Sequence, residues 1–196
     1  RHHAAQIDVF HAINMGSFSR ESTASVFARQ PRSDLRPPAV AGSFYPRGRA
    51  ELEATVKSLL RQAGPSREPG LLGIIAPHAG YMYSGPVAAS AFAPVEDTRF
   101  ERVLLIGPPH YVPVHGVAAP SAGAFATPLG EIAIDREAIA SLVDRGLVEI
   151  DDRAHAPEHS LEVELPFLQA ALGRFTLIPL LVGDVSPEEV AAIVDA

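Results

Sequence analysis

Short apolar runs alternate with segments of helical periodicity from residue 37 to the end of the chain. The runs 71–76, 102–106 and 175–182 are rich in Leu, Ile and Val, and each predicts a buried strand. Apolar residues recur at helical spacing in other segments, which are residues 52–60, 86–92, 139–143 and 161–172. This alternation predicts an α/β fold with a mostly parallel central sheet and helices on both faces.

Residues at the ends of these segments support the assignments. Gly64 stands where a helix C-terminal cap belongs, Asp135 can cap the helix that follows it, and residues 186–189 have the pattern of a capping box. Pro86 fits the first turn of a helix, whereas Pro166 lies inside its segment and predicts a kink.

Residues 1–36 differ from the rest of the chain. They contain five arginines and three acidic residues, although the whole chain has a formal net charge of −7. The stretch is rich in Ser around its centre and lacks a sustained apolar period, so we interpret residues 1–36 as a disordered extension and residues 37–196 as one α/β domain. Because the chain begins with Arg1 and ends within a predicted helix, we expect it to be the N-terminal part of a C-terminally truncated domain.

Composition disfavours several classes of partner. A net charge of −7 disfavours nucleic-acid binding, and the absence of cysteine excludes disulfides and thiolate metal sites within these residues. No apolar run reaches the roughly 18 residues that a membrane helix needs. We therefore expect a cytoplasmic protein that binds neither nucleic acid nor membrane.

Two of the predicted strands run directly into a Pro-His turn. His78 follows the run 71–76, and His110 follows the run 102–106. In a parallel α/β sheet, ligands bind beyond the carboxyl ends of the strands. Neutral imidazole is the commonest metal ligand and a frequent general base, so the pattern favours a shared metal or catalytic role. The alternative is that each ring only bonds backbone groups of its own loop.

His159 is the third candidate. It falls in the first turn of the helix predicted to begin near residue 157, where the helix dipole disfavours a charged ring and leaves a neutral ligand or proton acceptor. The alternative is a solvated helix start, with Glu158 and Glu162 as ordinary first-turn acids. We interpret His115 and His155 as surface residues.

Several stretches share their order and spacing with one known family. They are AGSFYP (41–46), IAPHAGY (75–81), GPPHYVP (107–113), TPLG (127–130), EHSLE (158–162) with LPF (165–167), and IPLLVG (178–183). Together they resemble the Memo family, also called AmmeMemoRadiSam system protein B. That family is similar in fold to the class III non-heme iron extradiol dioxygenases.

The resemblance implies a function and a site. His78 and His110 match metal ligands, for iron or copper, and His159 matches a pocket histidine with a catalytic role. The implied protein binds a non-heme metal and has redox or dioxygenase-like activity on an unknown substrate. Alternatives are a non-catalytic adaptor that keeps the fold and a hydrolase with a metal-activated water.

Further implications concern partners and departures from the family. In prokaryotes the resemblance implies association with radical-SAM and AMMECR-type proteins. Pro109 stands where the family commonly has Ser, which would alter the turn that aims His110. The family's later Asp-x-x-His segment and its final metal ligand would lie beyond residue 196.

Overall fold

The computed structural model describes residues 34–96, 98 and 100–196, together with the backbone of residues 11–14. Its strands are β1 (His11–Asn14), β2 (Leu35–Arg36), β3 (Gly73–Ile74), β4 (Arg102–Gly107), β5 (Val117–Ala119), β6 (Ala124–Thr127), β7 (Gly130–Ala133), β8 (Glu149–Ile150) and β9 (Thr176–Val182). They form one sheet in the order β3-β1-β4-β9-β5-β8 and a second in the order β2-β6-β7. Both sheets are mixed, and the predicted α/β class is confirmed.

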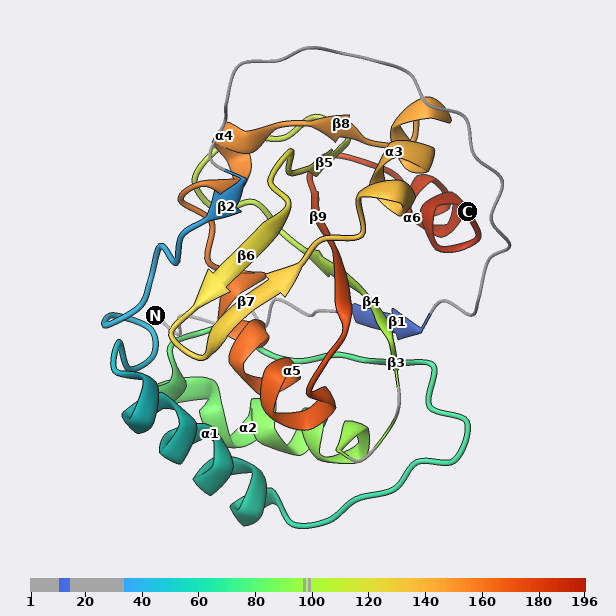
Figure 1. Cartoon of the computed structure of the whole chain (residues 1–196). Coiled ribbons are helices and arrows are strands. Elements are labelled where there is room, and N and C mark those ends of the chain that lie inside the picture. Colours follow the sequence, from blue (N-terminus) through green and yellow to red (C-terminus); the bar gives the residue numbers. More distant parts are fainter. Residues whose placement is uncertain (1–10, 15–33, 97, 99) are drawn as a thin grey trace, which may run out of the picture.

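The strands found in the three apolar runs all point in the same direction. β4 pairs in parallel with β9 along its whole length. β1 pairs antiparallel with both β3 and β4, so β3 and β4 also run the same way. The carboxyl ends of β3, β4 and β9 therefore lie at the same edge of the sheet, and β1 lies between β3 and β4 (Figure 1).

The first of these strands is shorter than its apolar run. Only Gly73–Ile74 pair as a strand, and Leu72 beside them is 75% exposed. The prediction of a buried strand over 71–76 is therefore wrong at its ends. β3 lies at the edge of the sheet, where alternate side chains can face solvent.

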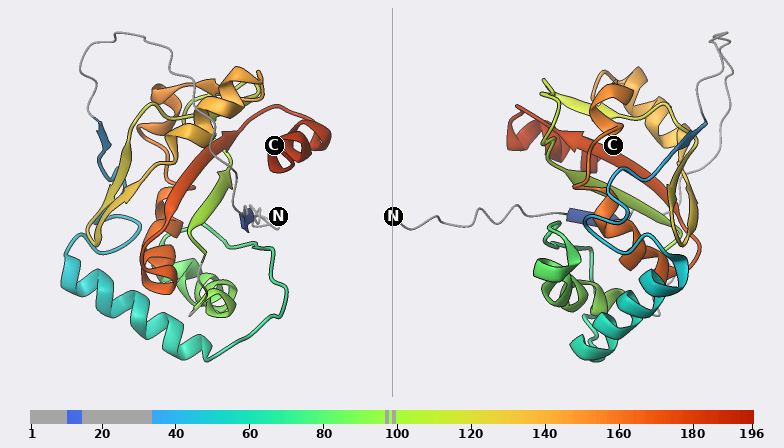
Figure 2. Two further views of the ribbon diagram at one scale, coloured as in Figure 1. Left: turned by 45° about the vertical axis from the view of Figure 1, so that its right-hand side comes forward. Right: turned by 90° about the vertical axis from the view of Figure 1, so that its left-hand side faces the viewer.

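Helices cover the sheet on both faces. In the described part of the chain they are α1 (Arg49–Ala63), α2 (Tyr81–Phe92), α3 (Arg136–Asp144), α4 (Asp152–His155), α5 (Leu165–Leu172) and α6 (Pro187–Val194), with 3-10 turns η1 (Ala93–Val95) and η2 (Glu162–Glu164). α1, α2 and α5 pack against one another, and α3 packs against β9. Figure 2 shows α6 on one side of β9 and the β6–β7 hairpin on the other. None of these described helices has the length and apolar character needed to cross a bilayer.

Proline positions differ from the prediction in two helices. α2 begins at Tyr81, so that Pro86 lies inside the helix and leaves the carbonyl of exposed Met82 without its usual helical donor. Pro166 does not kink a helix. It lies in the first turn of α5, where a missing N–H costs no helical hydrogen bond, and residues 157–161 are not helical.

The predicted helix ends are confirmed elsewhere. Gly64 ends α1 with a φ of 77°, and the Asp135 side chain accepts from the Ala138 N–H at the start of α3. Ser186 and Glu189 form the complete capping box of α6.

The division into an extension and a domain stays a prediction, because residues 1–10 and 15–33 lie outside the described residues. The described parts of this stretch take part in the fold. β1 lies within the larger sheet, and β2 pairs in parallel with β6.

Candidate metal centre

Three histidine rings meet beside the carboxyl ends of β3 and β4. One ring nitrogen each from His78, His110 and His159 lie within 4.8 Å of one another. The ring centroids of His110 and His159 are 4.4 Å apart, and that of His78 lies 5.2 Å and 5.9 Å from them. The fold thus gathers all three histidines singled out by the sequence, while their chemical roles remain predictions.

The cluster is closed on one side and open on the other. His78 is buried and His159 is partly buried, whereas His110 is exposed. The Phe44 ring lies 4.6 Å from the His159 ring, and the partly exposed Tyr111 ring lies 5.6 Å from it. A ligand would therefore approach from the side of His110.

Glu158 holds His110 in place. Its Oε1 lies 2.9 Å from His110 Nδ1, and its Oε2 accepts the backbone N–H of His110. The same carboxylate accepts the backbone N–H groups of His159 and Ser160. Burial raises the pKa of Glu158, but these hydrogen bonds together lower it below its usual value. A carboxylate at Nδ1 favours a proton there, and Nε2 is then the His110 nitrogen able to ligate a metal.

The sequence interpretation of this segment was wrong in its local structure. Glu158 is not a first-turn acid, because residues 157–161 are not helical and its side chain is buried. The helix dipole does not act on His159 for the same reason. Burial instead lowers the pKa of His159 more than neighbouring Glu158 raises it, which keeps the ring neutral.

The three rings fit a metal ion. Imidazole–metal distances of about 2.0–2.1 Å place three ligand nitrogens about 3.3–3.6 Å apart around one ion, so the three rings would have to move closer together than the present 4.8 Å limit. His159 Nδ1 is buried without a hydrogen bond, since its 3.2 Å approach to Glu158 Oε1 is poorly directed. A metal ion would satisfy that nitrogen.

A second acid, Glu162, anchors residues 36–45 beside the cluster. It is fully buried, and its carboxylate pairs with the Arg36 guanidinium at 2.5 Å. It also accepts the backbone N–H groups of Ala39 and Val40 at 2.8 and 3.0 Å and the Tyr45 hydroxyl at 2.6 Å. Reading Glu162 as a routine first-turn acid missed this role, because its partners lie more than 100 positions away.

The other histidines divide into one surface residue and one core residue. His115 is exposed, as predicted. His155 is 2% exposed, and its Nε2 lies 3.0 Å from the Ala118 carbonyl oxygen, so its assignment to the surface was wrong. Burial lowers the pKa of His155 to about 4.

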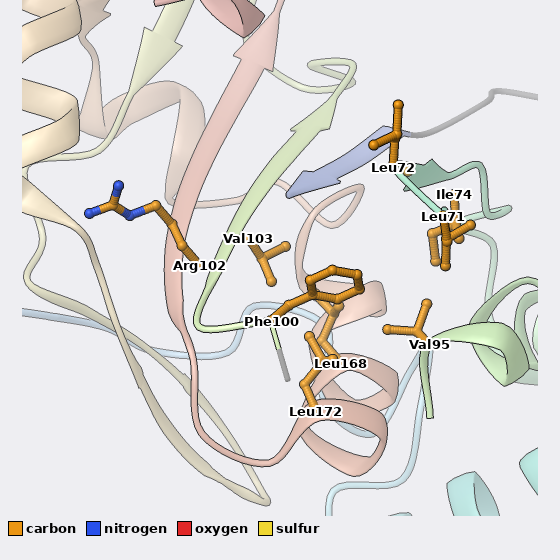
Figure 3. A pocket seen from close by; sticks show the side chains of 10 residues that line it. Leu71, Leu72, Ile74, Val95, Phe100, Arg102, Val103, Leu168 and Leu172 are labelled. Carbon is orange, nitrogen blue, oxygen red and sulfur yellow. The ribbon is translucent and has the colours of Figure 1, made fainter. Parts of the chain in front are cut away.

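An apolar pocket lies at the opposite ends of the strands from the histidines. Figure 3 shows its lining near the starts of β3 and β4, including Leu72, Phe100 and Leu168, around a small volume of about 30 Å³. Its one charged lining residue, Arg102, points away from it and pairs with Asp135 at 2.7 Å. The pocket therefore offers little to orient a polar substrate.

Known proteins are similar to this chain in amino-acid sequence. The family model described as "Memo-like protein" matches residues 36–196. A MEMO1 family protein of Nitrosopumilus maritimus is 36% identical over 161 residues, which cover 79% of this chain and 58% of the relative. Another from Ignicoccus hospitalis is 43% identical over 160 residues, or 74% of this chain and 55% of the relative. A third, from Thermotoga maritima, is 37% identical over 166 residues, or 78% and 59%. The chain thus spans less than two thirds of the length of these relatives.

Proposed function

The chain belongs to the Memo family, and from that premise we propose that its histidine cluster holds one iron or copper ion and serves a redox, dioxygenase-like function. The observation that carries this proposal is the approach of three ring nitrogens to within 4.8 Å of one another. Glu158 behind His110 adds support, because a carboxylate on the far nitrogen of a histidine is the usual outer partner of a metal ligand.

Each residue of the cluster has a distinct part in the proposal. His78 and His110 are ligands, and Glu158 sets the orientation of the His110 ring. His159 is either the third ligand or a neutral proton acceptor beside the ion, since both parts need an uncharged ring. Phe44 and Tyr111 lie against His159 and limit the access of water to its ring.

The donor set suits the proposed ions. Imidazole binds iron, copper and zinc well, and the absence of a thiolate removes the preference for softer metals. When bound, iron or copper would supply one-electron redox chemistry at the cluster.

Anaerobic calorimetric titration with ferrous iron, and separately with cupric copper, tests the proposal. We expect one ion per chain, and His78→Ala or His110→Ala should weaken binding by more than about 100-fold, above the range for outer-sphere partners. The exposed His115→Ala variant is the matched control and should bind as the unsubstituted chain does. Equal binding by the unsubstituted chain and a His78→Ala/His110→Ala variant would contradict the proposal and favour an adaptor that keeps only the fold.

The role of His159 is separated in the same titration. If His159 is a ligand, His159→Ala should weaken metal binding as strongly as His78→Ala. If it accepts a proton instead, metal binding by His159→Ala should match that of the unsubstituted chain.

A cytoplasmic location and association with radical-SAM and AMMECR-type proteins belong to the same proposal. They rest on family membership, and co-purification of the chain with such partners from a native host would test them.

A further inference from the structure

The buried carboxylate of Glu162 collects its donors from one short segment of chain. The Arg36 guanidinium, the Ala39 and Val40 N–H groups and the Tyr45 hydroxyl all donate to it. Because Glu162 is fully buried, these bonds replace water entirely. Their geometry fixes where the backbone of residues 36–45 can run.

The same segment touches two parts of the histidine cluster. The Phe44 ring packs at 4.6 Å from the His159 ring. The Phe44 carbonyl accepts the Tyr81 N–H at 2.8 Å, at the end of the turn that begins with His78. Gly80 in that turn lies in van der Waals range of the Phe44 backbone, since a Cβ atom there would be 3.5 Å from the carbonyl oxygen. Residues 36–45 therefore brace the turn after His78 and the ring of His159 together.

The Arg36 side chain extends this brace to His110. Besides pairing with Glu162, its guanidinium donates to the backbone carbonyls of His155 and Glu158. Glu158 in turn holds the His110 ring and backbone through its carboxylate. His110 and His159 are thus each connected to the Glu162 carboxylate through two intervening residues, and His78 is connected through the longer path of Phe44 and the turn that ends at Tyr81.

We propose that Glu162 is a positioning residue for the metal centre, acting through the segment 36–45 and the Arg36 guanidinium on all three histidines. The inference rests on the proposed metal-binding function of those histidines. Glu162 is not among the residues that would contact an ion, which are His78, His110 and His159. It therefore acts only by holding these histidines in position.

The chain offers a matched control two residues away. Glu164 is as fully buried as Glu162, but neither of its carboxyl oxygens has a hydrogen-bond partner. Glu164→Gln therefore makes the same carboxyl-to-amide replacement at the same burial without breaking a link to the histidines. It controls for a new amide in this part of the core, whereas Glu162→Gln also removes the carboxylate that pairs with Arg36.

Cobaltous ion is the probe, because its visible absorption bands report the geometry of its ligands as well as its affinity. In the 196-residue chain, Glu162→Gln should weaken Co²⁺ binding about tenfold, the lower end for loss of an outer partner, and should shift the bands. Glu164→Gln should leave both unchanged. Tyr45→Phe removes one donor and keeps the ion pair, so it should shift the bands in the same direction but less.

A double variant guards against simple unfolding. Arg36→Met/Glu162→Met removes both buried charges, which usually preserves folding, but it also removes the directed bonds to residues 39, 40 and 45. It should shift the bands at least as much as Glu162→Gln, because it also removes the Arg36 bonds to the carbonyls of His155 and Glu158. Unchanged Co²⁺ affinity and bands in folded Glu162→Gln, Tyr45→Phe or the double variant would overturn the inference while leaving the metal centre intact. Failure of the unsubstituted chain to bind Co²⁺ would instead overturn the metal centre, and this inference with it.

Discussion

Glu162 and Glu164 lie two residues apart on η2, both with 0% exposure, yet their surroundings are opposite. Glu162 meets a guanidinium, two backbone N–H groups and a phenol. Glu164 has no hydrogen-bond partner for either oxygen, and burial raises its pKa well above the usual value for a glutamate. Two acids of equal burial therefore have different polar surroundings.

The difference shows that burial alone does not give a polar residue its role. A buried charge with complete partners organises the chain around it, and removing one partner leaves the other charge uncompensated. A buried carboxyl without partners only loses its hydration, which costs free energy of folding. Substitutions at these two positions should therefore change stability in opposite directions.

The largest expected effect is at Glu162. Glu162→Leu leaves the Arg36 guanidinium, itself only 6% exposed, without its carboxylate. We expect the free energy of unfolding to fall by about 3–5 kcal/mol, the usual cost of breaking a buried pair. Urea denaturation followed by circular dichroism measures this change.

The double variant sharpens that test. Arg36→Met/Glu162→Met should recover part of the lost stability, because no buried charge remains unpaired while the N–H groups of residues 39 and 40 still lose their acceptor. A loss below about 1 kcal/mol for Glu162→Leu alone would show that the pair is not the organising contact inferred from its geometry.

The next effect concerns His155. Its carbonyl accepts the Nε–H of Arg36, the residue that pairs with Glu162. Burial lowers the pKa of His155 in the folded state to about 4, from an ordinary value of 6.5. The unfolded chain then takes up the proton first as the pH falls. Stability is fully present above pH 6.5 and is lost progressively toward pH 4, by about 3 kcal/mol at 1.36 kcal/mol per unit.

Unfolding free energies measured from pH 7.5 to 4, for the unsubstituted chain and His155→Gln, isolate this contribution. The difference between the two proteins should shrink as the pH falls. Parallel curves would mean that His155 does not carry the acid sensitivity.

The sequence predicted the histidines better than it predicted the groups that hold them. His78 and His110 could be found because each follows an apolar run that forms a strand, and parallel strands bring their carboxyl ends together. The resemblance of the EHSLE motif also brought His159 into the set. Both the Pro-His turns after the apolar runs and the EHSLE motif can be recognised from a few consecutive residues.

The acids and Arg36 gave no comparable signal. Glu158 and Glu162 have the spacing of surface acids on a helix, yet Pro166 starts a helix after them and leaves the segment to fold inward. Arg36 stood at the end of a stretch interpreted as disordered, and its partner Glu162 is 126 positions away. A pairing of that separation depends on the whole fold and cannot be predicted from local pattern.

At Glu164 we expect a substitution to stabilise the protein. Glu164→Met keeps a similar length and removes the buried carboxyl, so it should raise the free energy of unfolding by about 2 kcal/mol at pH 7. Because burial raises the folded-state pKa of Glu164, the protonated form is favoured on folding, and this stability is present below the unfolded pKa and lost as the pH rises. The gain from Glu164→Met should therefore be larger at pH 7 than at pH 4.5, in paired urea titrations. A destabilised Glu164→Met protein would mean that the carboxyl has a partner in solution.

The smallest expected effect is the difference in stability between two hydrogen bonds of the same core, one to a charged acceptor and one to a neutral acceptor. The Tyr45 hydroxyl donates to the Glu162 carboxylate at 2.6 Å, whereas the Tyr81 hydroxyl donates to the Val163 carbonyl at 2.8 Å. Hydrogen bonds to charged groups contribute more to stability than neutral ones, so Tyr45→Phe should cost about 1.5 kcal/mol and Tyr81→Phe about 1 kcal/mol. Both rings are buried and both substitutions remove only a hydroxyl, so thermal unfolding of the two variants compares the acceptors directly. If Tyr81→Phe lost more stability than Tyr45→Phe, the hydrogen bond to the Val163 carbonyl would be stronger than the one to the Glu162 carboxylate. The difference between Glu162 and Glu164 would then need a cause other than the charged acceptor.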